Sequence, residues 1–231
     1  MANHLSDQQR DEIHAKVLHA AALLFVEKGY AGTTTRELAA QSGIQVSAMN
    51  RAFGSKEHIL SELVRQVLDA QFALAEKMLA TETSDEVLRY ALEAALQLYM
   101  AECSEAIRDL YCNVYALSET SELLLRTSAE TVIAPTFGRY LPDYTLEDFY
   151  QLEIASGSII RGYMTVRCDE SFPAEMKVTR FLETALRIYR VPQEKISEAI
   201  DFVKQFDLWS IAQESIRGML EYLECTEYTA E

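Results

Sequence analysis

Apolar residues recur at helical spacing along most of the chain. The first such stretch places them on one helical face, at Ile13, Val17, Ala20, Ala21, Leu24 and Phe25. Ser6 and Gln9 have the spacing of a capping box, which predicts the start of this helix, and Gly29 predicts its end. The chain shows no strand-type alternation, and good helix formers dominate its composition. The pattern therefore predicts an all-α protein.

Two short helices joined by a glycine turn follow the first helix. Thr34 and Glu37 form a second capping box, Gly43 breaks the chain, and the helical pattern resumes from Gln45 to Phe53. A helix-turn-helix needs a turn residue with positive φ, a small residue where the helices touch, and apolar residues that lock the crossing. These positions are filled by Leu38, Ala39, Gly43, Ile44 and Met49. The spacing predicts a helix-turn-helix over residues 35–54.

A series of helices is predicted beyond this motif. Ser55 caps an apolar pattern that continues to about Leu79, and this long helix would link the motif to the rest of the chain. Further helices are predicted after Ser84, over 104–117, over 121–140 with a bend near Pro135, over 145–167, over 174–190, and as a pair between 193 and 223 broken near Asp207. We expect two domains, residues 1–54 and residues 55–231.

The charge of the chain is divided unevenly. The net charge is -15, which argues against a nucleic-acid partner because phosphates demand Lys and Arg. Residues 1–60 nevertheless hold six Lys or Arg and six Asp or Glu, so the whole excess of negative charge lies beyond residue 60. DNA would therefore be tolerated at the N-terminal end and repelled elsewhere.

The composition argues against several other classes of protein. No run of 18 apolar residues occurs, and residues 1–10 lack the apolar core of a signal peptide, so we expect a cytoplasmic protein with no membrane partner. The sequence has no Gly-rich phosphate loop, and its histidines all precede residue 60, so we expect no enzymatic activity. The cysteines lack C-x-x-C spacing and nearby histidines, which predicts free thiols, no metal and no cofactor; they are Cys103, Cys112, Cys168 and Cys225.

Three stretches around the helix-turn-helix share residues with a known family. They are Ala20-Ala21-x-x-Leu24-Phe25-x-x-Lys28-Gly29-Tyr30-x-x-Thr33-Thr34, then Leu38-Ala39-x-x-Ser42-Gly43-Ile44, and finally Phe53-x-Ser55-Lys56-Glu57 with Leu60. Together these motifs, over about residues 12–64, resemble the N-terminal domain of TetR-family regulators. Beyond this region the chain resembles the family only in length and helical content.

The resemblance implies a homodimer that binds a double-stranded DNA operator, with the helix Gln45–Ala52 of each subunit in a major groove. Arg36 and Arg51 carry guanidinium groups suited to a guanine edge, although Arg51 could instead be a solvated surface residue. Asn50 stands where the family often has tyrosine, and its amide suits adenine. The full set of expected DNA contacts is Thr34, Thr35, Arg36, Gln45, Val46, Ser47, Asn50, Arg51 and Lys56.

The resemblance also implies a small-molecule effector held among the later helices. The part of the chain beyond residue 60 has twice as many acidic as basic residues, so we expect a neutral or cationic effector that is partly aromatic or apolar. Packing in the core is the alternative for each candidate residue. The candidates are Tyr99, Cys103, Tyr111, Tyr115, Phe137 and Tyr140.

Two later helices are candidates for the dimer interface. A row of small residues flanked by larger ones allows close helix approach, over Leu152, Ala155, Ser158 and Gly162. In the family such a helix pairs with the next one across a two-fold axis, which here implies Val178, Phe181, Leu182, Ala185 and Tyr189. An intrachain crossing of the same two helices is the alternative.

Two functions remain open on this basis. The first is a ligand-responsive transcription regulator, a repressor that a small molecule releases from its operator, and Gly43, Arg36 and Lys56 favour it. The second is a helical interaction protein of the same fold that has lost specific DNA readout. The neutral N-terminal domain and Asn50 favour this alternative.

Overall fold

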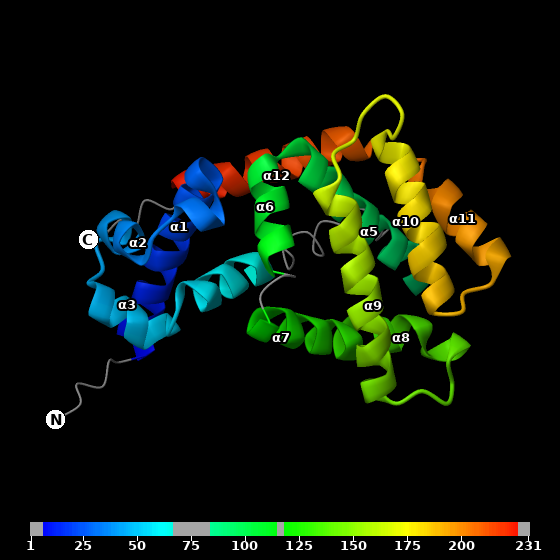
Figure 1. The fold of residues 1–231 in the computed structure, drawn as a ribbon, viewed down its shortest axis with the longest axis horizontal. Coiled ribbons are helices and arrows are strands. Elements are labelled where there is room, and N and C mark those ends of the chain that lie inside the picture. The colour runs from blue at the N-terminus through cyan, green and yellow to red at the C-terminus, as the bar shows by residue number, and fades with distance from the viewer. Residues whose placement is uncertain (1–6, 67–83, 115–117, 226–231) are drawn as a thin grey trace.

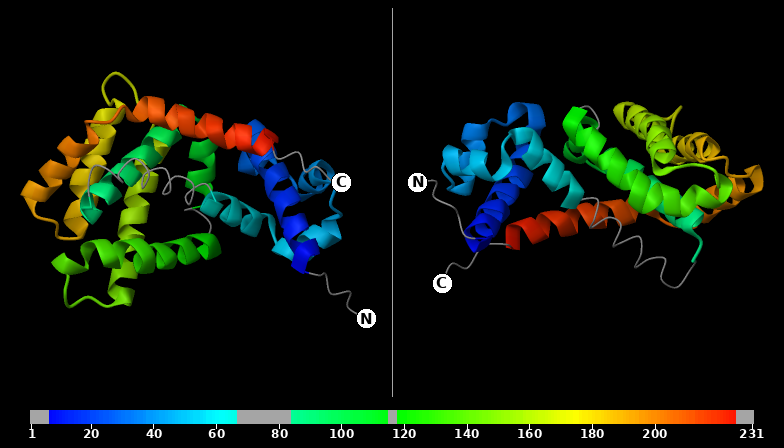
Figure 2. Two further views of the ribbon diagram at one scale, coloured as in Figure 1. Left: turned by 180° about the vertical axis from the view of Figure 1, so that it is seen from behind. Right: turned by 90° about the horizontal axis from the view of Figure 1, so that it is seen from below.

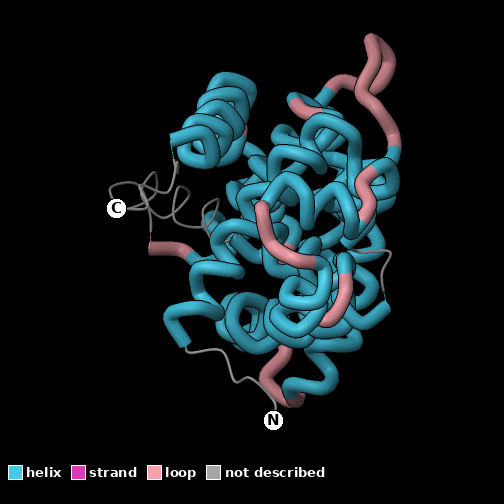
Figure 3. The backbone as a smooth tube through the Cα atoms, turned by 90° about the vertical axis from the view of Figure 1, so that its left-hand side faces the viewer, coloured by secondary structure: helices cyan, strands magenta, loops and turns pink. Residues whose placement is uncertain are grey.

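The computed structural model describes residues 7–66, 84–114 and 118–225, and these residues form helices joined by short connections (Figure 1, Figure 3). The helices pack in two parts. The N-terminal part, which contains the predicted helix-turn-helix, is called the reader below. It comprises α1 (Asp7–Gly32), α2 (Thr35–Ser42), α3 (Val46–Phe53) and helical residues 56–66. The body comprises α5 (Glu86–Cys103), α6 (Glu105–Val114), α7 (Ser118–Ser128), α8 (Ala134–Phe137), α9 (Leu146–Thr165), α10 (Ala174–Ile188), α11 (Gln193–Val203) and α12 (Leu208–Cys225). The all-α prediction is confirmed.

Local backbone chemistry sets the boundaries of the reader helices. Gly29 interrupts α1 with a φ of 73° and a ψ of 164°, as its position predicted. Thr34 and Glu37 form the predicted capping box at the start of α2. Gly43 ends α2 in the left-handed conformation, with a φ of 68°. The chain therefore turns where the helix-turn-helix requires it to turn.

Apolar side chains from the reader helices form one core. Leu38 of α2 and Met49 of α3 are completely buried, and Ala39 is also buried, so these three occupy the positions predicted for them. Ile44 in the turn is half-buried and packs against this core. His14 of α1 stacks on Phe53 of α3 with ring centroids 4.2 Å apart, which adds an aromatic contact between the first and third helices.

α5 forms the centre of the body, and α6, α9, α10, α11 and α12 pack around it. α12 also contacts α1, so it runs along one side of the molecule from the body to the reader (Figure 1, Figure 2). The predicted break before α12 is confirmed, because Asp207 caps the helix by accepting a hydrogen bond from the Ser210 N–H at 3.2 Å. The predicted long helix from Ser55 is helical over 56–66, and its continuation lies outside the described residues.

The segment around Pro135 departs from a simple bent helix. α7 is followed by a π-helical turn, η1 (Ala129–Ile133), then by α8, and then by a short 3-10 turn, η2 (Gly138–Tyr140). Pro135 has no N–H to give to the turn before it, and the Ala134 N–H bonds to the carbonyl of Ala129 five residues back. The predicted bend is thus spread over a wider turn that faces α9.

A buried ion pair ties the connection between α9 and α10 to α5. The ammonium of Lys177, which is 1% exposed, donates to Glu102 Oε1 at 2.5 Å and also to the Val166 carbonyl. The Cys168 N–H donates to the other Glu102 oxygen at 3.2 Å. Burial opposes ionisation of Glu102. The hydrogen bond from Lys177 and the other polar contacts together outweigh this effect, so the pKa of the carboxyl is lowered.

None of the helices in the described residues is both long and apolar enough to cross a membrane.

Candidate functional site

The outward face of α3 brings together most of the residues predicted to contact DNA. Met49 and Phe53 hold one side of this helix in the core, which turns the opposite side to solvent. Gln45 and Asn50 therefore lie on the surface with Arg51, and no side chain of the reader covers them. The exposed set on this helix and its cap is Gln45, Val46, Ser47, Asn50 and Arg51.

The start of α2 adds a second polar surface next to α3. Arg36 is exposed and Thr35 is half-buried. The Thr34 hydroxyl is already engaged, because it accepts from the Glu37 N–H at 3.2 Å and donates to the Glu37 carboxylate at 2.8 Å. The hydrogen bond from Lys28, followed by those from Thr34, lowers the pKa of Glu37 to about 2. Glu37 is thus an ionised cap that fixes the start of α2 and leaves Arg36 free to point outward.

Lys56 has a structural contact inside the reader. Its ammonium donates to the carbonyls of Tyr30 and Thr33, each at 2.8 Å, and lies 4.1 Å from the centroid of the Tyr30 ring. Burial lowers the pKa of this lysine. Two of its three donors therefore hold the connection between α1 and α2, which leaves one for the phosphate contact predicted from the sequence.

The reader is also tied to the body through α6. The Tyr30 N–H donates to the Asp109 carboxylate at 2.9 Å, and the Asn113 amide donates to the other oxygen of the same carboxylate at 2.9 Å. The contact lies where Gly29 interrupts α1 and frees the Tyr30 N–H. A hydrogen bond thus links α6 of the body to the end of the first reader helix.

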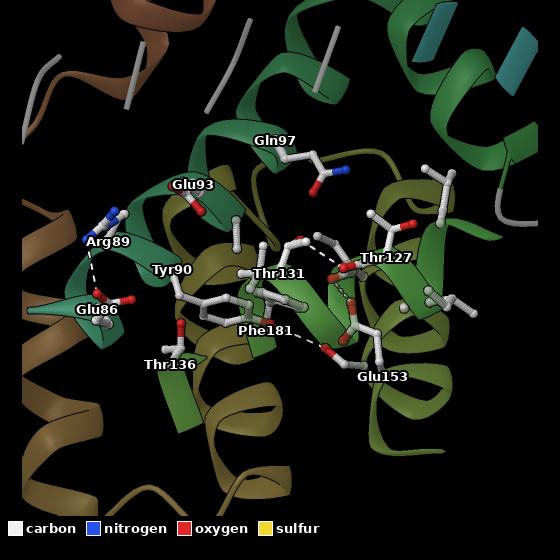
Figure 4. Close-up of a pocket in the computed structure, with 18 of the residues that line it drawn as sticks. Glu86, Arg89, Tyr90, Glu93, Gln97, Thr127, Thr131, Thr136, Glu153 and Phe181 are labelled. Atoms are coloured by element: carbon white, nitrogen blue, oxygen red, sulfur yellow. Dashed lines mark hydrogen bonds and ion pairs between the residues drawn. The ribbon is translucent and has the colours of Figure 1, made fainter. Parts of the chain in front are cut away.

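A cavity of about 380 Å³ lies in the body between α5, α7, η1 and α9 (Figure 4). Leu124, Val132 and Ile160 supply the apolar wall, and Arg65, from helical residues 56–66, also lines the cavity. Its polar groups come from several helices, and most are hydroxyls, amides or carboxyls. They include Tyr90, Glu93, Gln97, Thr127, Ser128, Thr131, Thr136, Glu153 and Ser156.

Glu153 is a buried ionisable group in the wall of this cavity. Tyr189 donates to one of its carboxyl oxygens and Ser128 to the other, each at 2.7 Å. Burial raises its pKa, and these two hydrogen bonds oppose that rise only in part. The pKa of Tyr189 is also raised, first by burial and then by the charge of Glu153. Burial therefore shifts both groups toward their protonated forms.

An aromatic cluster supports this end of the cavity. The ring of Tyr189 stacks on that of Phe137, with centroids 4.1 Å apart and planes within 7° of parallel. Tyr90 meets both rings edge-on, and its hydroxyl lies 3.3 Å from the Ser156 hydroxyl. Packing of this kind fixes Tyr189 on Glu153.

The cavity differs from the effector site predicted from the sequence. None of the predicted residues that the structure describes lines it. Tyr111 of α6 is buried in the core of the protein, and the ring of Phe137 stacks on that of Tyr189. Tyr99 lines a second cavity of about 180 Å³, while Cys103 and Tyr140 pack half-buried against the core, and Tyr115 lies outside the described residues. For Tyr111 and Phe137 the core alternative is the correct one.

Polar residues on otherwise apolar helix faces were the signal that this prediction missed. Glu93 and Gln97 lie one helical turn apart in a stretch of α5 that is buried almost throughout. Glu153 holds the corresponding position on the buried face of α9. A buried carboxyl or amide needs a partner, so such residues mark a cavity more directly than aromatic residues, which also fill ordinary cores.

The structure divides the predicted dimer residues into two groups. Ala155, Ser158 and Gly162 are exposed on α9, and a Cβ added at Gly162 would meet nothing within 4 Å. Leu152 is half-buried. On α10 the prediction is wrong, because the apolar stripe of this helix faces the core of its own chain; Val178, Phe181, Leu182, Ala185 and Tyr189 are all 5% exposed or less. The intrachain alternative holds for that helix.

Comparisons with known proteins identify the first part of this architecture. Residues 17–63 match the family model described as bacterial regulatory proteins, tetR family. The chain is 32% identical over 116 residues to the HTH-type transcriptional repressor KstR2 of Mycolicibacterium smegmatis, which covers 50% of this chain and 51% of that protein. The chain thus spans about half the length of that relative.

Solved structures share the fold over most of the chain. A crystal structure of RolR in complex with resorcinol superposes with a TM-score of 0.59 at 15% identity, over 86% of this chain and 96% of the other. A TetR-family transcriptional regulator from Pectobacterium atrosepticum gives a TM-score of 0.55 at 17% identity, over 80% of this chain and 95% of the other. The reader and the body therefore share their arrangement with these two proteins.

Proposed function

By its N-terminal domain the chain belongs to the tetR family of bacterial regulatory proteins, and on that premise we propose that it is a transcription regulator that binds DNA as a homodimer and responds to a small molecule. The observation that carries the proposal is the outward face of α3, where Gln45, Asn50 and Arg51 stand exposed beside Arg36 of α2. A helix held by its apolar face, with amide and guanidinium groups on the other, is suited to a major groove.

DNA binding by this reader is expected to depend on few phosphate contacts. Residues 1–60 are neutral overall, and Lys28 is paired with Glu37 at 2.9 Å. Base contacts by Arg36, Asn50 and Arg51 would then supply a larger share of the specific free energy than in a strongly basic domain. The relatives named as transcriptional repressors favour repression as the outcome.

The experiment that tests DNA binding is a fluorescence anisotropy titration of the full chain. The labelled duplexes cover the DNA flanking its own gene, and a random duplex serves for comparison across a salt series. Arg36→Ala and Arg51→Ala should each lose roughly 1–3 kcal/mol on the specific duplex and little on the random one. Arg217→Ala, an exposed arginine of α12, is the matched control and should bind like the wild type. A wild type without salt-dependent binding would favour the interaction-protein alternative.

The dimer is proposed to form through the exposed face of α9. Ala155, Ser158 and Gly162 offer close approach, and Ile154 and Val166 add apolar surface that is 42% and 54% exposed. Exposed apolar side chains around a small-residue row fit a helix pair formed between two copies of the chain. The α10 contribution would then come from its exposed face, which carries Met176, rather than from the buried stripe.

The cavity between α5, α7 and α9 is the proposed effector site. Its volume of about 380 Å³ is within the usual range for small-molecule sites, roughly 300–1,000 Å³. Arg65 lines it from the helix that directly follows α3. An effector that binds differently in two positions of this helix would shift the spacing of the recognition helices. The resorcinol bound by RolR supports a small-molecule role for this fold.

A further inference from the structure

The inner wall of the cavity presents the buried carboxyl group of Glu153. Glu153 accepts two hydrogen bonds, and both come from neutral hydroxyls, those of Tyr189 and Ser128. No lysine, arginine or histidine among the described residues acts on this carboxyl. An ionised carboxylate so deeply buried is costly unless an opposite charge joins it.

Gln97 adds an unsatisfied donor to the same cavity. The residue is 7% exposed, and its side-chain nitrogen is buried without a hydrogen-bond partner among the described residues. Figure 4 shows its amide directed toward the space between α5 and η1. A buried amide donor of this kind needs an acceptor, which a ligand in the cavity can supply.

Acidic and basic side chains line different parts of the cavity. Glu93 and Glu153 belong to the buried wall, at 8% and 9% exposed. The two guanidinium groups lie toward solvent, since Arg65 is exposed and Arg89 is engaged with Glu86 at 3.3 Å. A cationic group that reaches the inner wall therefore meets carboxyl groups and leaves the guanidinium groups behind, whereas an anionic group there would meet no basic residue of the described lining.

We propose, resting on the effector site proposed above, that this cavity binds an organic ammonium compound with a flat apolar body, whose ammonium group sits on the Glu153 carboxylate. An ionised carboxylate offers about four lone-pair positions, and the hydroxyls of Tyr189 and Ser128 occupy two of them. The ammonium takes the remaining positions and neutralises the charge. The body of the ligand lies against Leu124, Val132 and Ile160, and an acceptor atom faces Gln97.

This assignment requires proton release on binding. Where Glu153 is protonated in the empty protein, the ammonium displaces the carboxyl proton to the buffer while the amine keeps its own. Among the described residues, the titratable groups that face Glu153 are Tyr189 from α10 and, across the cavity, Tyr90 and Glu93 from α5. Arg65 and Arg89 line the cavity toward solvent, and α7 and η1 present hydroxyls and apolar groups. The pKa of Tyr189 is raised well above its ordinary value, so the proton released on binding comes from the Glu153 carboxyl.

The test uses three probes with one shared indole body, tryptamine, tryptophol and indole-3-acetate, which carry an ammonium, a hydroxyl and a carboxylate. Thermal shift and calorimetry are measured on the full chain. We expect tryptamine to bind at least tenfold tighter than tryptophol, and indole-3-acetate to give no shift. Glu153→Gln should weaken tryptamine at least tenfold and leave tryptophol unchanged. Glu147→Gln, on the same helix and exposed, is the matched control.

Calorimetry of the wild type in two buffers with different ionisation enthalpies provides a readout that needs no variant. Proton release with tryptamine and none with tryptophol is expected. Equal affinity for the two probes, unchanged tryptamine binding by Glu153→Gln, or failure of both tryptamine and 2-phenylethylamine to bind overturns the proposal. DNA binding is scored separately, so loss of the regulator function and loss of the amine site give different results.

Discussion

The reader and the body place their polar groups on opposite sides of their helices. In α3 the amide and guanidinium groups of Gln45, Asn50 and Arg51 face solvent, and Met49 faces the core. In α5 and α9 the carboxyl and amide groups of Glu93, Gln97 and Glu153 are turned inward. The difference indicates two kinds of partner: one that arrives as an extended surface, and one small enough to be enclosed.

Lys56 is the exception to this contrast, because its ammonium group binds carbonyls within the reader instead of facing solvent. Lys56→Ala leaves the carbonyls of Tyr30 and Thr33 without their charged donor. We expect a loss of roughly 3 kcal/mol in the free energy of unfolding, since each hydrogen bond to a charged group contributes about 1.5–3 kcal/mol and this site is only partly buried. Urea unfolding followed by circular dichroism measures it.

The control for Lys56 is Lys28→Ala, which removes an exposed lysine paired with Glu37 and should change stability little. DNA titrations of the same variants sharpen the result. If Lys56→Ala unfolds like the wild type but lowers the salt slope by about one unit, the residue acts on phosphate rather than on the two carbonyls.

The reader could be predicted in detail from the sequence because its geometry depends on special residues. Gly29, Gly43 and the Thr34–Glu37 box each require a particular backbone conformation, and a glycine or cap at the right spacing announces it. The same residues carry the family resemblance. Only the inward role of Lys56 was hidden, because its partners are carbonyls, which no side-chain pattern reveals.

The body could be predicted only as a set of helices. Every helix from α9 to α12 was expected, with the cap at Asp207, yet the orientation of their faces was not. The stripe of α10 that includes Phe181 looked suited to an interface but is buried within the chain. A helix packed among several neighbours has more than one apolar face, and periodicity does not say which neighbour each face meets.

The exposed row on α9 tests whether the body also has an outward partner. Gly162 is exposed, and a Cβ added there would meet none of the described atoms within 4 Å, so Gly162→Leu should retain the fold. In a dimer packed through this face the added bulk should cost roughly 1–3 kcal/mol of association free energy. Sedimentation velocity at micromolar concentration measures the dimer fraction, and Gly138→Leu, also without close neighbours, is a control outside this helix. An undiminished dimer would move the interface away from α9.

A smaller effect is expected at the turn of the reader. Gly43 has a φ of 68° and nothing within 4 Å of an added Cβ, so Gly43→Ala introduces backbone strain without a clash. We expect a loss of roughly 1–2 kcal/mol in the free energy of unfolding. Gly138→Ala, at a helical φ and in open space, should lose none of this. Equal losses in the two variants would mean that the left-handed turn does not limit the stability of the reader.

The smallest change, and one of opposite sign, is expected from Glu153→Gln without ligand. Burial raises the pKa of Glu153 above its ordinary value of 4.5, so between these two values the folded protein holds a proton that the unfolded chain has released. Stability therefore falls as the pH rises from 4.5 through the raised pKa, because in this window the folded state binds more protons than the unfolded state. A glutamine keeps a hydrogen-bonding group beside Tyr189 and Ser128 but does not titrate. The variant should therefore lose less stability over that range and be more stable than the wild type at the higher pH.

Urea unfolding of both proteins from pH 4.5 to pH 8 measures the difference, with Glu147→Gln as the exposed control. Parallel curves for the wild type and Glu153→Gln would show that ionisation of Glu153 does not destabilise the folded protein. The body and the reader would then differ in the placement of their polar groups but not in the cost of charging them.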